Sequence, residues 1–92
     1  MMRKIKLGPT AEIMLAALPK KELAQVEAVL ALLRHPPSGR EKKLIVHRLR
    51  PGSSQFIVRI NDRYRLLYHL VAKEVVMIDD ILRVDGLRKL EG

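Results

Sequence analysis

The hydrophobic pattern of the chain changes from a helical to an alternating period at the segment His-Pro-Pro-Ser-Gly that occupies residues 35–39. After this segment, apolar and polar residues alternate in short runs, as they do in β-strands. Before it, apolar residues recur three and four positions apart, as on one face of a helix: Leu23, Val26, Val29, Leu30 and Leu33. The chain therefore contains both helices and strands, which excludes all-α and all-β folds.

The region before the break contains a strand and two helices. Residues 3–7 alternate polar and apolar side chains, which predicts a short strand with one buried face. Gly8 and Thr10 are both candidate N-caps of a first helix, and Pro9 suits its first position. A second helix is predicted over residues 20–34. The two helices form a hairpin whose apolar sides must be buried against another element.

The region after the break predicts strands. The expected fold is α+β in the order β-α-α-β-β-β: an N-terminal strand, a two-helix hairpin and an antiparallel strand meander, with the helices packed on one sheet face. The length of 92 residues corresponds to a single domain, residues 1–92. The strands are expected over residues 56–60, 64–71 and 75–84, and residues 44–49 are a further candidate strand.

The apolar pattern also determines the register of the central hairpin. Its two apolar sets share one face only if the loop has an odd number of residues, and residues 61–63 provide such a loop. One face then pairs Ile60 with Tyr64, Val58 with Leu66 and Phe56 with Tyr68; the other pairs Arg59 with Arg65, Ile57 with Leu67 and Gln55 with His69. The first face is expected to lie under the helices, so Tyr64 and Tyr68 are predicted to be core residues, with base stacking as the alternative.

The second face carries two arginines directly opposite each other. Like charges in such a pair destabilise a sheet unless something neutralises them. One hypothesis is an anion bound at Arg59 and Arg65. The alternative is an internal salt-bridge cluster with Asp79 or Asp80, which interrupt the alternation of the last strand and indicate a bulge.

The net charge of +8 indicates a polyanionic partner. Residues 34–65 contain nine basic and two acidic side chains, so +7 of the charge lies there; a basic surface without a partner is the alternative. The absence of cysteine excludes disulfides and a cysteine nucleophile and fits a reducing compartment, expected to be the cytoplasm. No apolar run reaches the length of about 20 residues that a membrane-spanning helix needs.

Several motifs resemble the RelE/ParE superfamily of toxins from toxin–antitoxin pairs. The most specific is Tyr64-Arg65-Leu66-Leu67-Tyr68, which follows an aromatic- and arginine-containing strand and an Asn-Asp turn. The resemblance covers essentially the whole chain and includes Pro9-Thr10-Ala11, Leu18-Pro19 and Ile81-Leu82-Arg83-Val84.

The resemblance implies a small, metal-independent endoribonuclease that enters the ribosome, cleaves mRNA through the substrate 2′-hydroxyl and is held inactive by an acidic antitoxin. No cofactor, small-molecule ligand or membrane is expected. The alternatives within the superfamily are a ParE-type toxin that acts on DNA gyrase and an inactive relative that only binds its antitoxin. The three histidines lie 12 and 22 positions apart, which is not a metal-ligand spacing.

The resemblance also suggests site residues. Arg65 matches the arginine most often given the catalytic role, Arg59 matches a basic residue of the neighbouring strand, and Arg88 is a shifted match to a third. Fixed arginines would stabilise the charge that builds up on the phosphate. Further RNA- or phosphate-binding candidates are Lys42, Lys43, Arg48, Arg50, Arg63, Arg83 and Lys89.

The sequence does not identify the proton-transfer group, because no Tyr or His follows Arg88, where the family usually has one. The candidates are His69, His47, Glu41 and a substrate-assisted route. His69 is the one that the predicted register places on the face of the two arginines.

Overall fold

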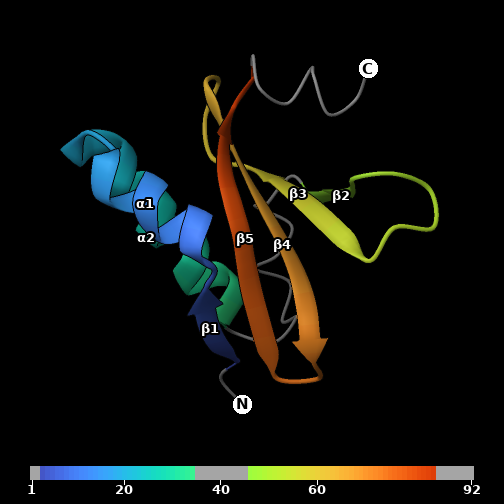
Figure 1. Ribbon diagram of the computed structural model, residues 1–92. Coiled ribbons are helices and arrows are strands. Elements are labelled where there is room, and N and C mark those ends of the chain that lie inside the picture. Colours follow the sequence, from blue (N-terminus) through green and yellow to red (C-terminus); the bar gives the residue numbers. More distant parts are fainter. Residues whose placement is uncertain (1–2, 35–45, 85–92) are drawn as a thin grey trace.

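The computed structural model describes residues 3–34 and 46–84 (Figure 1). Two helices cover one face of a five-stranded sheet of order β1-β5-β4-β3-β2. β1 is parallel to β5, and the other neighbours are antiparallel. The elements are β1 (Lys4–Leu7), α1 (Pro9–Ala17), α2 (Lys20–Arg34), β2 (Val46–Arg48), β3 (Gln55–Arg59), β4 (Tyr64–Ala72) and β5 (Val75–Arg83).

This architecture confirms the predicted α+β fold of a strand, a helical hairpin and an antiparallel meander. The candidate strand at 44–49 is a strand over Val46–Arg48, and residues 44 and 45 lie outside the described part of the chain. In the described residues, no helix is long and apolar enough to cross a membrane.

The helical hairpin begins where the chain leaves β1 and approaches β5. Gly8 is the N-cap of α1 and donates its backbone N–H to the carbonyl of Ile78 at 2.9 Å. A Cβ at this position would lie 3.2 Å from the same oxygen, so glycine suits the close approach. Pro9 occupies the first turn of α1, and Leu18, which precedes Pro19, is extended and ends the helix.

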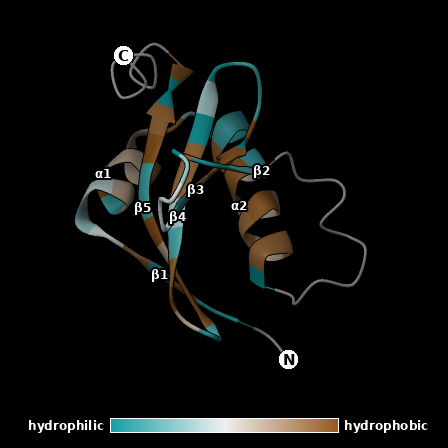
Figure 2. Cartoon of the chain, turned by 90° about the vertical axis from the view of Figure 1, so that its right-hand side faces the viewer, coloured by the Kyte–Doolittle hydropathy of each residue, from teal (hydrophilic) through white to brown (hydrophobic). Residues whose placement is uncertain are grey.

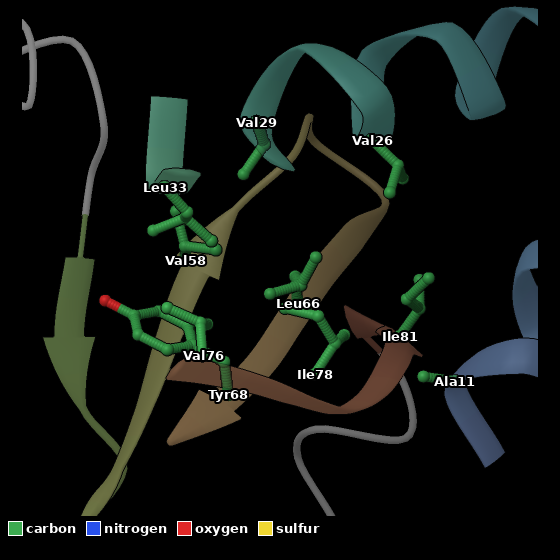
Figure 3. Close-up of a cluster of buried hydrophobic side chains, with 10 residues drawn as sticks. All are labelled: Ala11, Val26, Val29, Leu33, Val58, Leu66, Tyr68, Val76, Ile78 and Ile81. Atoms are coloured by element: carbon green, nitrogen blue, oxygen red, sulfur yellow. The ribbon is translucent and has the colours of Figure 1, made fainter. Parts of the chain in front are cut away.

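The core lies between the two helices and the sheet (Figure 3). Tyr68 is buried in it and Tyr64 packs against it, as the sequence predicts for these two tyrosines. Phe56 stacks on Tyr68, with ring centroids 5.4 Å apart. The buried residues of the cluster are Ala11, Val26, Val29, Leu33, Val58, Leu66, Tyr68, Val76, Ile78 and Ile81.

Two leucines of β4 allow a matched test of this core. Leu66 is fully buried, whereas Leu70 is 45% exposed. We expect Leu66→Ala to lower the free energy of unfolding by about 2–5 kcal/mol, because a cavity remains where the side chain was. Leu70→Ala should cost about 1 kcal/mol or less. Urea unfolding followed by circular dichroism measures both, and equal losses would contradict the packing described here.

The predicted hairpin register is confirmed in every pair from Gln55–His69 to Arg59–Arg65. The bulge suggested by the two aspartates is also present, because Tyr68 pairs with Ile78 and Leu67 with Asp80, so Asp79 is the extra residue. The bulge explains how Ile78 and Ile81, three positions apart, are both buried in the core.

Candidate functional site

The arginine pair lies on the sheet face opposite the helices. Arg59 of β3 is directly across from Arg65 of β4, one pair away from the turn. The adjacent Ile60 donates its N–H to the carbonyl of Tyr64 at 3.1 Å. Hydrogen-bonded and non-bonded pairs alternate in antiparallel sheets, so the arginines form the closer, non-bonded type, with a Cα separation of about 4.5 Å. Two cationic side chains therefore leave the sheet side by side.

Arg65 is held by backbone carbonyls. Its Nη1 donates to the main-chain oxygen of Asn61 and, at 3.0 Å, to that of Tyr64. The residue is partly buried. Within residues 3–34 and 46–84, no carboxylate forms an ion pair with Arg65. Its orientation is thus set by neutral acceptors, and its full charge is available to an anion.

Arg59 forms an ion pair with Asp62 of the hairpin turn. The Arg59 side chain is 43% exposed and that of Asp62 is 87% exposed. Such exposed pairs contribute between nothing and about 1 kcal/mol. An incoming anion can therefore replace Asp62 at little cost.

The two aspartates of β5 form other contacts. Oδ2 of Asp79 lies 2.8 Å from Nδ1 of His69 and accepts a hydrogen bond from Nε2 of Gln55 at 3.2 Å. Oδ1 of Asp80 accepts from the backbone N–H of Ile81 at 2.8 Å. Neither carboxylate is paired with an arginine of the hairpin among the described residues, so the alternative of an internal salt-bridge cluster is wrong.

A cleft of about 220 Å³ lies at the arginine pair. Its walls are formed by His47, Ile57, Arg59 and Arg65. His47 enters because β2 pairs with β3 in a register that places it opposite Ile57, two positions before Arg59 and on the same face of the sheet. Its side chain is exposed. Figure 2 shows most of β2 in the hydrophilic colour.

His69 lies on the same face but farther along β4, four residues from Arg65. At about 3.3 Å per residue this is a separation of about 13 Å along the strand. Its Nδ1 is engaged by Asp79, and the pair Ile57–Leu67 lies between it and the arginines. Of the histidines in the described residues, the structure thus brings His47 to the cleft and leaves His69 outside it.

A second apolar cluster adjoins the cleft. Ile57 and Leu67 are buried on the face opposite the helices, and Leu49 and Leu82 pack against them. Ile57 also lines the cleft, so part of its wall is apolar, and an apolar wall strengthens the interaction of a cation with an anion.

The other predicted phosphate-binding residues lie outside the cleft. Arg48 is opposite Phe56, and its guanidinium carbon lies 5.5 Å from the ring centroid. Arg50 is exposed in the bend after β2, and Arg63 is exposed in the hairpin turn. Arg83 is exposed at the end of β5. Lys42, Lys43, Arg88, Lys89 and Glu41 lie outside the described residues.

The carboxylate of Asp62 allows a test of the arginine pair as an anion site. We expect Asp62→Asn to free Arg59 and to raise the affinity for a short RNA by up to about fivefold, while stability changes by less than about 1 kcal/mol. Fluorescence anisotropy should show the gain at low ionic strength and its loss at high ionic strength. Weaker binding by this variant would instead mean that Asp62 orders Arg59 for its ligand.

The fold of this chain is similar to that of several solved structures. A chain of the RelE–RelB complex from the archaeon Pyrococcus horikoshii OT3 superposes with a TM-score of 0.67 at 23% identity, over 90% of this chain and 96% of that one. The E. coli DinJ–YafQ toxin–antitoxin complex matches with 0.70 at 14% identity, over 95% and 98%. The chain has the RelE toxin fold. The YoeB–YefM complex from Staphylococcus aureus matches with 0.68 at 17% identity, over 88% and 95%.

No protein-family model and no curated protein matches the chain. The assignment of the RelE fold therefore rests on the similarity to these solved structures. Within residues 3–34 and 46–84, no three histidine or acidic side chains are grouped as a metal site would require.

Proposed function

We propose that this chain is the toxin of a toxin–antitoxin pair and that it cleaves mRNA on the ribosome as an endoribonuclease. The observation that carries the proposal is the cleft in which Arg65, oriented by two carbonyls and without a carboxylate partner in the described residues, lies beside Arg59 and His47. The RelE toxin fold supports it, and so does the charge of +7 in residues 34–65.

The proposed reaction uses the 2′-hydroxyl of the RNA as the nucleophile. The 2′-oxygen attacks the adjacent phosphorus, the bond from phosphorus to the 5′-oxygen breaks, and a 2′,3′-cyclic phosphate forms. Negative charge accumulates on the phosphate oxygens, where Arg65 and Arg59 stabilise it without a metal ion. His47 accepts the proton of the 2′-hydroxyl, and the departing 5′-oxygen takes a proton from water.

The remaining predicted residues have supporting roles in this proposal. Arg88 is a further phosphate contact, and His69 is the alternative proton-transfer group. The basic side chains outside the cleft attract the ribosome and the message through their charge. The partner that inhibits the toxin is an acidic antitoxin that folds on binding, and both act in the cytoplasm.

Primer extension after induction of the protein in growing cells tests this function. The proposal predicts new 5′ ends within translated messages and an unchanged superhelicity of a reporter plasmid. Intact messages together with a change in supercoiling would point to a ParE-type action on gyrase, which the lack of a Tyr or His after Arg88 would then explain. Intact messages with unchanged supercoiling would indicate an inactive relative.

A further inference from the structure

Asn61 occupies the first position of the turn between β3 and β4, which lies at the top of Figure 1. The oxygen and the nitrogen of its side-chain amide both form hydrogen bonds. Oδ1 accepts hydrogen bonds from the backbone N–H groups of Arg63 (2.8 Å) and Tyr64 (3.0 Å). Nδ2 donates to the carboxylate of Glu22 and, at 2.6 Å, to Oε1 of Gln25. Because the two backbone donors need an oxygen, the amide has one orientation, and its NH₂ group faces α2.

The main chain of the same residue holds the central arginine of the cleft. The carbonyl oxygen of Asn61 is one of the two acceptors of Arg65 Nη1, and that of Tyr64 is the other. A shift of the turn relative to α2 therefore moves the oxygens that orient the guanidinium.

The turn is docked on α2 by polar contacts. A pocket of about 370 Å³ lies between them, and its walls are formed by Lys21, Glu22, Gln25, Asn61, Asp62 and Arg63. All six of these side chains are polar, whereas Ile60 and Tyr64, which flank the turn, pack against the core. The hydrogen bonds from the Asn61 amide to Glu22 and Gln25 join the tip of the turn to α2.

We propose that Asn61 is a positioning residue that couples α2 to the guanidinium of Arg65. Its Oδ1 closes the turn, its Nδ2 ties the turn to Glu22 and Gln25, and its main-chain oxygen transmits that position to Arg65. The consequence for cleavage rests on the proposed nuclease function, whereas the coupling itself is a property of the folded chain.

Two substitutions separate the role of Asn61 in closing the turn from its role in tying the turn to α2. Asn61→Asp keeps an oxygen for the two backbone donors but places a carboxylate against that of Glu22, so the turn stays closed and loses its contact with Glu22. Adding Glu22→Gln supplies an amide donor on the helix that faces the new carboxylate. The double variant therefore restores the contact with its direction reversed.

The experiment measures ¹⁵N relaxation of the Arg65 Nε–Hε group together with single-turnover cleavage of mRNA on ribosomes. For Asn61→Asp we expect greater mobility of the guanidinium and a saturating rate lowered about tenfold, because small displacements of a catalytic group are costly. The half-saturating concentration of ribosomes should change less than about twofold. The double variant should recover the wild-type relaxation and rate to within about twofold.

Unchanged relaxation of Arg65 in Asn61→Asp would overturn the proposal, and so would a double variant that recovers neither readout. Gln25→Ala removes one acceptor of the Asn61 amide and is expected to raise the mobility of the Arg65 guanidinium less than Asn61→Asp does. If Asn61→Asp does not fold, the relaxation of Gln25→Ala tests the coupling in its place. If the wild-type protein cuts no message, the proposed function fails, but the relaxation data still confirm or refute the coupling.

Discussion

Arg65→Ala is expected to lower the single-turnover rate of mRNA cleavage by about 10²- to 10³-fold while the protein remains folded. Within residues 3–34 and 46–84, the guanidinium is oriented by two main-chain oxygens and by no carboxylate, so its charge is directed at the phosphate. Because these charge-assisted hydrogen bonds are only partly buried, their loss should lower the free energy of unfolding by about 1–3 kcal/mol. Rapid-quench cleavage on programmed ribosomes and urea unfolding measure the two effects.

Two further variants separate orientation from charge. Arg65→Lys keeps the charge but cannot reproduce the planar fork of donors, so it should recover only a small part of the rate. Lys73→Ala removes one positive charge from the exposed turn between β4 and β5, far from the cleft, and should leave the rate within about twofold. An equal loss in the Lys73 and Arg65 variants would mean that net charge, not a fixed arginine, carries the activity.

His47→Gln is the second substitution with a large expected effect. Removing a proton-transfer group costs about 10²- to 10⁴-fold in rate, and we expect a loss in the lower part of this range because the side chain is exposed. The affinity for ribosomes should change little, since glutamine keeps a polar side chain of similar size. Single-turnover cleavage on programmed ribosomes measures this loss.

His69→Gln is the matched comparison, because both histidines lie on the same sheet face. His69 is engaged by Asp79 and lies outside the cleft, so its substitution should lower the rate less than about fivefold. The opposite ranking, with His69→Gln the more damaging, would assign the proton transfer to His69 and would leave His47 as a binding residue.

The hairpin shows how much of the site can be predicted from the local pattern of apolar residues. An odd loop length and the alternation of apolar residues were sufficient to place Arg59 opposite Arg65, because a register slip of one residue would expose the whole core face. The bulge at Asp79 could be predicted for the same reason, since two consecutive aspartates interrupt an apolar alternation that the core requires.

The position of His47 could not be derived in this way. β2 is only three residues long and is joined to β3 through residues 49–54, whose Pro-Gly-Ser-Ser composition does not specify a hairpin type. Its register depends on pairing with β3, and that pairing selects His47 over His69 for the cleft. The pairing of Arg59 with Asp62 was also missed, although a separation of three residues across a tight turn is a usable signal.

The role of Asn61 depends on contacts that the local sequence does not contain. The turn signal Asn-Asp predicts that its oxygen closes the turn. Its partners Glu22 and Gln25 are 39 and 36 positions away, and only the packing of α2 on the sheet brings them near. Tertiary structure thus converts an ordinary turn residue into one that holds the cleft.

Cleavage of a message with a single 2′-deoxynucleotide at the cut position tests the central claim most directly. The all-ribose message, bound in a programmed ribosome with the purified protein, should be cut to a product that ends in a 2′,3′-cyclic phosphate. The message that lacks this one hydroxyl should remain intact, because the nucleophile is missing. Cleavage of the deoxy message at the same position, or no cleavage of the all-ribose message, would contradict the proposed function.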